Sequence, residues 1–311
     1  MPALPALHAF TVVASPLSGH PRMHCSYLAL LLLLCANLLF AAPPPQPLTP
    51  NVARFVLANA EFSVMHEMGH MLIAEYDLPV LGREEDAADQ LGFILLFRLY
   101  AKLPRDEVDA RLLDIADYWR LEWQTPKPPP DQVLAWDSHP LDEQRYYNIA
   151  CLLYGSDMAR LDWLPPLTGL PYERAVYCDQ EFLQASKAFE WIRHARRHPS
   201  IQHRAALRLN YDTPAVDRDS TLPLIALLRD GDHLQRMVDE VFRLFRPPRP
   251  LTIQLVSCGA PDAWYNSNSG EMALCYERLQ HFREMAENLP RLRTPVTRQC
   301  PGPAGLRPGG C

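Results

Sequence analysis

The sequence lacks an excess of basic residues, an internal repeat and any C-x-x-C pair. Its 311 residues include 30 Lys and Arg against 36 Asp and Glu, for a formal net charge of -6. A mildly acidic chain has no positive field with which to hold nucleic acid. These absences leave an ordinary globular protein, which suits a composition of 48% hydrophobic and 21% charged residues.

Long apolar runs are also scarce, and only residues 27–42 form one. This run is short for a membrane span, follows Arg22 and ends in Ala41-Ala42, which is typical of a signal peptide over residues 1–42. Met23 could be the true start. The prolines that follow leave the cleavage point open, and an uncleaved membrane anchor at 27–42 is the alternative. We expect an exported protein, either periplasmic or secreted.

Export changes the reading of the cysteines, because an oxidising compartment favours disulfide bonds. Six of the eight cysteines lie after the signal, and six cysteines allow 15 connectivities. Two pairs bracket compact local units, which would leave the last two to close the tail; free buried thiols are the alternative. The candidate disulfide cysteines are Cys151 with Cys178, Cys258 with Cys275, and Cys300 with Cys311.

Pro-rich residues 43–50 read as a linker, residues 51–289 as one domain and residues 290–311 as a flexible Pro/Gly-rich tail. Two strands are expected around a turn-rich segment, as a small C-terminal β-hairpin. The sequence therefore predicts an α+β fold that is predominantly α-helical. Helical patterns cover 53–76, 83–103, 106–122, 142–154, 172–197 and 220–245, and the strands are 251–256 and 271–276.

The most informative motif is His66-Glu67-Met68-Gly69-His70, which matches H-E-x-x-H within the first predicted helix. Two histidines one helical turn apart lie on the same face and can bind one metal ion. Glu67 lies between them, beside the metal but not bound to it, where it could act as a general base. Gly69 costs a helix about 1 kcal/mol relative to Ala, so another segment is expected to pack close to it.

A catalytic zinc needs a third protein ligand, and Glu85 is the leading candidate. A short connection joins the first two predicted helices, so they should pack antiparallel and bring the start of the second back toward His70. Asp89 follows Glu85 by four residues and could accept a hydrogen bond from a metal-bound histidine. The alternatives for the third ligand are Glu84, Asp86 and Glu75.

H-E-x-x-H followed by E-x-x-A-D resembles the gluzincin pattern of thermolysin-like and HtpX/Ste24-type zinc peptidases. The run 78–89 is more similar to a bacterial family of inferred metallopeptidases described as a domain of unknown function, with a similarity over about 51–287. The resemblance implies a zincin-like fold, with the H-E-x-x-H helix packed on an antiparallel E-x-x-A-D helix, and one Zn²⁺. Only residues 71–84 separate His70 from Glu85, a shorter gap than in thermolysin-like enzymes, so the shape of the cleft is not implied.

Ser138-His139-Pro140 with Arg145 resembles a further segment of the HtpX/Ste24-type enzymes, in which a histidine faces the reacting carbonyl. His139 could therefore donate a hydrogen bond to an oxyanion; a His-Pro turn before a helix is the alternative. Arg145, Tyr265 and Tyr276 are further candidates for contacts with the substrate or transition state. For the two tyrosines, ordinary core packing is the favoured interpretation.

These observations predict a zinc-dependent hydrolase of peptide bonds, which acts on a peptide or protein substrate. The competing hypothesis is a catalytically inactive, zinc-stabilised envelope protein that binds a protein partner. A third is a fold without metal, in which the histidines are buried and hydrogen-bonded.

Overall fold

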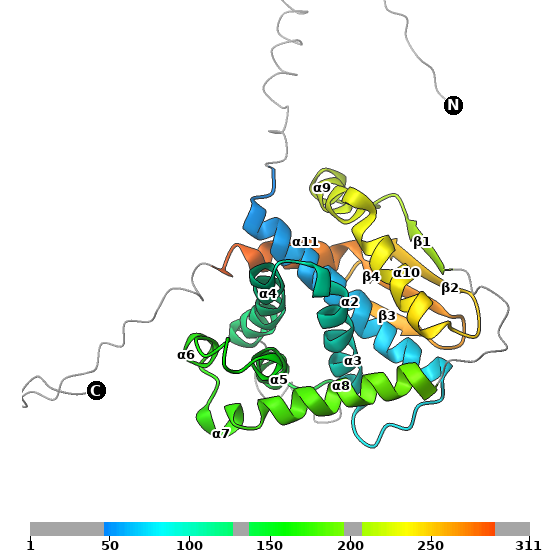
Figure 1. Cartoon of the computed structure of the whole chain (residues 1–311). Helices are drawn as coiled ribbons and strands as arrows, with labels where there is room; N and C mark the ends of the chain where they lie inside the picture. Colours follow the sequence, from blue (N-terminus) through cyan, green and yellow to red (C-terminus); the bar gives the residue numbers. More distant parts are fainter. Residues whose placement is uncertain (1–46, 127–136, 196–206, 290–311) are drawn as a thin grey trace, which may run out of the picture. The chain divides into compact units, whose positions relative to one another are not determined.

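The computed structural model describes residues 47–126, 137–195 and 207–289 (Figure 1). The predicted signal peptide, the predicted tail, and Cys300 with Cys311 lie outside these residues. No helix within the described ranges is both long and apolar enough to cross a membrane. The described part is predominantly helical, with one small mixed sheet, so the coarse prediction of an α+β fold is confirmed.

The helix that carries H-E-x-x-H is α2 (Pro50–Glu75), and it is buried over most of its length. Pro50 suits the first helical position, and the Thr49 hydroxyl accepts the Val52 amide there. After Glu75 the chain turns away at Asp77, whose φ is 47°. Figure 1 shows α2 between the helices α3 and α4 and the sheet, so its residues meet neighbours from most of the fold.

Helix α3 (Glu84–Leu99) packs against α2 at two glycines. A methyl group on Gly69 would lie 2.8 Å from the Cα of Ala88, and one on Gly92 would lie 2.9 Å from the backbone nitrogen of His66. Both distances are shorter than any ordinary contact between such atoms. The close approach expected at Gly69 is therefore confirmed, and a second one lies on the partner helix.

The other helices surround this pair. After the 3₁₀ turn η1 (Tyr100–Lys102), α4 and α5 pack on each other and α8 packs on α5 (Figure 1). The expected helix over 220–245 is interrupted, because Gly231 and Asp232 adopt φ of 58° and 52°. The helices are α4 (Arg105–Gln124), α5 (Asp142–Ser156), α6 (Leu164–Thr168), α7 (Tyr172–Ala175), α8 (Cys178–Ala195), α9 (Arg218–Arg229), η3 (Asp230–Asp232), α10 (His233–Phe245) and α11 (Tyr276–Ala286).

The sheet has the strand order β1-β2-β4-β3. Strands β2 and β4 occur where two strands were predicted, but the expected hairpin between them is wrong, because they run parallel. The segment that joins them contains β3, which pairs antiparallel with the far side of β4 and occupies the edge. The strands are β1 (Leu207–Tyr211), β2 (Leu251–Val256), β3 (Ala263–Asn266) and β4 (Glu271–Cys275).

Two disulfides connect these elements. Cys151–Cys178 joins α5 to the start of α8, and Cys258–Cys275 joins the segment after β2 to the end of β4. Both are pairings that the sequence favoured. Disulfides of this kind are typical of an oxidising environment.

The contact at Gly92 can be tested by replacing this glycine with alanine. We expect Gly92→Ala to lower the free energy of unfolding by about 1–3 kcal/mol, because the added methyl meets α2 backbone that cannot move without separating the helices. Chemical denaturation measures the change. Gly82→Ala is the matched control, since a methyl there meets no atom within 4 Å; equal stability of the two variants would contradict the role of the close contact.

Candidate active site

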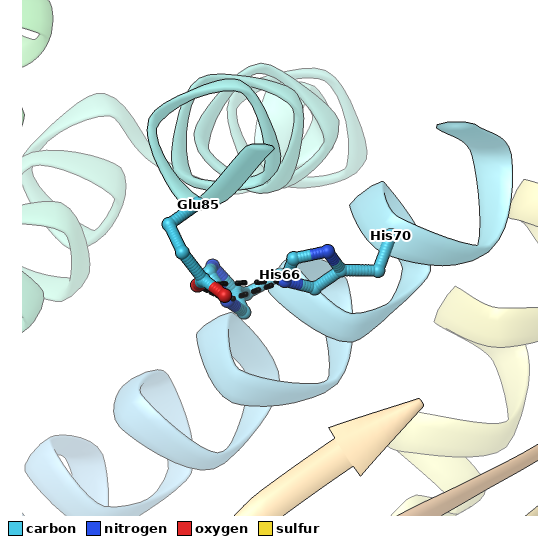
Figure 2. Close-up of side chains that lie close together, drawn as sticks. All are labelled: His66, His70 and Glu85. Carbon is cyan, nitrogen blue, oxygen red and sulfur yellow. Dashed lines mark hydrogen bonds and ion pairs between the residues drawn. The ribbon is translucent and has the colours of Figure 1, made fainter. Parts of the chain in front are cut away.

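His66, His70 and Glu85 bring three potential metal-ligand atoms together, and Figure 2 shows their side chains converging from α2 and α3. Nε2 of His66 lies 3.2 Å from Nε2 of His70. The Oε2 atom of Glu85 lies 3.2 Å from the first nitrogen and 3.5 Å from the second. The antiparallel packing expected of the two helices thus brings the first turn of α3 to the histidines.

The Oε2 atom of Glu85 is buried and has no well-aligned hydrogen bond with the described residues, although imidazole nitrogens of three histidines lie within 3.5 Å of it. Burial alone would raise the pKa of this carboxyl, but the His66 and His70 rings outweigh burial and hold the pKa below its usual range. In turn, burial would lower the pKa of His70, but Glu85 and Glu84 raise it to about 9. A carboxylate that draws protons onto adjacent imidazoles is a place where a divalent cation could replace those protons. The residues present therefore fit a metal ion.

Both histidine rings are held from behind by acidic side chains. Nδ1 of His66 lies 2.8 Å from Oδ1 of Asp89, and Nδ1 of His70 lies 2.7 Å from Oε1 of Glu84. These contacts turn both Nε2 atoms toward Glu85. The orientation is the one that carboxylates behind metal-bound histidines impose.

Arg145 holds Asp89 in place. Its Nε donates to Oδ2 of Asp89 at 2.8 Å and an Nη donates to Oδ1 at 2.5 Å, while the guanidinium stacks 3.6 Å from the centre of the Trp119 ring. Arg145 was expected to contact substrate. In the structure its guanidinium binds Asp89 instead. Because Asp89 contacts the His66 ring, Arg145 helps to orient His66.

Of the alternatives for the third ligand, Glu75 lies elsewhere and Glu84 contacts the outer nitrogen of His70. The Glu75 carboxylate accepts hydrogen bonds from Arg249 and Tyr265.

A second group of potential metal ligands consists of Cys258, Cys275 and Glu277. Its two sulfurs form a disulfide and are not available to a metal.

Glu67 lines a pocket of about 250 Å³, and His66 and His139 line the same pocket. Its side chain is buried, with 7% of the residue exposed, and no hydrogen bond or ion pair joins it to another described residue. Burial raises the pKa of its carboxyl, although the charges of His66, His70 and Arg278 oppose this. The pocket is lined by Phe62, Ser63, His66, Glu67, Tyr118, Trp119, Glu122, His139, Asp142, Arg145, Asp262, Ala263 and Arg278.

His139 reaches the same region from the segment before α5. Its Nε2 lies 3.3 Å from Oε2 of Glu85, and its Nδ1 lies 3.1 Å from Oδ1 of Asp137. The side chain is half exposed and lines the pocket beside Glu67. The structure therefore brings His139 to the site from a distant part of the sequence.

The two tyrosine candidates do not line this pocket. The Tyr265 hydroxyl donates to Glu75 at 2.6 Å, and the buried Tyr276 donates to the carbonyl of Asp212 at 2.7 Å. Both hydroxyls form hydrogen bonds away from the pocket that contains Glu67. They are therefore not placed to contact an oxyanion there.

Sequence reasoning missed Trp119 and Arg278, which line the pocket from α4 and α11. No local motif marks either residue. Ser63 could have been found, because it precedes Glu67 by one helical turn and must share its face.

Residues 46–192 match the model of a family described as "Putative metallopeptidase". This part of the chain is similar to the kind of family that its motifs predicted, and that description implies a metal and peptide or protein substrates. The predicted similarity to about residue 287 exceeds the matched range. No curated protein and no solved structure is significantly similar to the chain.

The role of Asp89 is tested by Asp89→Asn, which keeps the size of the side chain but removes its charge. We expect the affinity for zinc to fall by about 10- to 100-fold, because the His66 ring loses the group that orients it. Titration against a competing chelator measures this affinity. Asp86→Asn on the same helix is the control; an equal loss in that variant would favour Asp86 as a metal ligand.

Proposed function

We propose that the protein hydrolyses peptide bonds, with one zinc ion bound by His66, His70 and Glu85 and with Glu67 as general base. The convergence of these three side chains beside an unpaired, buried Glu67 carries this proposal. Two imidazoles and one carboxylate are a donor set of catalytic zinc sites, which keep a position open for water or substrate. The family match supports the metal and the reaction class.

Zinc in this position supplies a Lewis acid that polarises a carbonyl oxygen and lowers the pKa of a water molecule. The chain's own groups perform the proton transfers. Glu67 accepts a proton from the attacking water and donates it to the amine that leaves. A buried carboxylate without a fixed partner suits both steps, because no ion pair has to break before it takes up the proton.

His139 is suited to bind the oxyanion that forms at the reacting carbonyl. Its ring borders the pocket, and Asp137 holds Nδ1, so that Nε2 faces the region of Glu85 and Glu67. A donor already aimed at the developing charge costs no reorganisation during the reaction.

Strand β3 offers a place for an extended peptide. It is one of the two edge strands of the described sheet, and no other described strand pairs with its outer side. Ala263 at its start lines the Glu67 pocket. Arg249 and Tyr265 both bind Glu75 at the end of α2, and Arg249 also donates to the Asn268 carbonyl in the β3–β4 turn at 3.1 Å. These contacts fix the edge strand beside the catalytic helix, where added peptide could pair with its backbone.

We also infer that the protein is exported, with residues 1–42 as its signal peptide. The two disulfides support this inference, since they would not persist in a reducing cytosol.

Glu67→Gln tests the catalytic assignment. We expect hydrolysis of a peptide library to fall by at least about 100-fold while zinc content stays unchanged, because the amide cannot accept the proton but occupies the same space. Elemental analysis and a cleavage assay on the same preparation give both values. Unchanged cleavage would refute the role of Glu67, and a zinc-bound wild type that cleaves nothing would favour the partner-binding alternative.

His139→Gln separates two roles for this histidine. We expect kcat to fall by about 100- to 1,000-fold with zinc affinity unaltered, because the variant loses an aimed donor but no metal ligand. Loss of zinc from the variant would show instead that His139 binds the ion.

A further inference from the structure

We propose that Arg278 recognises a carboxylate of the substrate, and that the preferred peptides place such a group in the pocket beside Glu67. This inference rests on the proposed function and adds a substrate class to it. The carboxylate could come from a free C-terminus or from an Asp or Glu side chain. Both sources present the same planar anion.

The position of Arg278 is set by α2. Its Nε donates to the Ser63 hydroxyl at 3.1 Å, and Ser63 lies one helical turn before Glu67 on the same face of α2. The guanidinium also lines the pocket that contains Glu67. A substrate group bound there would lie close to the proposed general base.

Arg278 has N–H donors that its hydrogen bonds to the described residues do not use. A guanidinium carries five N–H groups, and here one bonds Ser63 and one donates to the Pro261 carbonyl at 3.3 Å. No carboxylate of the described residues forms an ion pair with it. Three N–H groups therefore remain for a ligand, and a guanidinium fork matches a carboxylate through two parallel hydrogen bonds.

The acids that line the same pocket do not supply the missing partner. Glu122 forms an ion pair with His281, and the exposed Asp262 accepts the backbone amide of Ala263 at 2.8 Å. Asp142 lies in the first turn of α5, where the helix dipole favours its charge. Glu67, the fourth acid of the pocket, is influenced by the charge of Arg278 but accepts neither of the hydrogen bonds that Arg278 donates to Ser63 and Pro261, so Arg278 keeps unused donors for an anion.

The pocket has room and apolar walls for a substrate residue. Its volume of about 250 Å³ is several times that of a water molecule, and Phe62, Tyr118 and Trp119 line it. The Arg278 guanidinium itself lies 5.9 Å from the Tyr118 ring centre and 5.4 Å from that of Phe282, so both rings limit its movement. A cation held against aromatic rings at the wall of a pocket is suited to selecting one substrate group.

The experiment compares matched peptides on the zinc-loaded full chain. One arm pairs free-acid with C-terminally amidated peptides, and the other pairs Glu with Gln at each position of a scanned sequence. We expect one arm to show kcat/KM about 10- to 100-fold higher for the carboxylate form, as for a hydrogen-bonded charge pair. Arg278→Gln should reduce this ratio to near one, and Arg278→Lys, which keeps the charge but not the fork, should leave part of it.

Arg283→Gln on the same helix is the matched control, and it should retain the full ratio. Peptide binding to the Glu67→Gln protein gives a second readout that does not require turnover. The Kd of each carboxylate peptide is compared with the Kd of its matched amide or Gln peptide. Selective binding without any cleavage by the wild type would refute the proposed function alone. Three results would each overturn the role of Arg278. They are a carboxylate-to-neutral kcat/KM ratio near one in the wild type, an unchanged ratio in Arg278→Gln, and a preference for Lys or Arg side chains.

Discussion

The close contact between α2 and α3 is the constraint on which the site depends. Gly69 lies against Ala88 and Gly92 lies against the backbone of His66, so the two helices approach each other without side chains between their backbones. This spacing lets the carboxylate of Glu85 reach both imidazoles at 3.2–3.5 Å. Any wider spacing would remove Glu85 from the group, because the carboxylate is carried by the first turn of the second helix and cannot follow the histidines.

Two glutamates on α2 show how the fold treats buried charge. Glu61 is fully buried and is matched by the Tyr100 hydroxyl, Arg111 and His233, as a structural carboxylate must be. Glu67, less than two turns later on the same helix, is nearly as buried but has no such partner. Leaving a buried carboxylate unpaired costs stability, and a fold that satisfies one acid and leaves the next unsatisfied argues for a function at the second.

Features set by local sequence were predictable, and features set by distant segments were not. The four-residue spacing of His66 and His70 predicts that both rings lie on one helix face. The glycine between them predicts a close helix contact, and the short link to Glu85 predicts that its carboxylate returns to the histidines. The parallel pairing of β2 and β4 does not, because it depends on where β3 inserts. Likewise, Arg145 was marked by a motif, but its partner Asp89 and its stacking on Trp119 depend on how α3, α4 and α5 pack together.

The proposed chemistry and the proposed substrate contacts come from different parts of the chain. The proposed metal ligands, Glu67 and His139 all lie within residues 46–192, which match the family. Arg278 and β3 lie beyond that range, yet they border the pocket that contains Glu67. Since Arg278 is anchored on Ser63 and β3 is tied to Glu75, both substrate elements are attached to α2 itself. Under this proposal, replacement of α11 or β3 would change which peptide is bound without moving the groups proposed to transfer the proton.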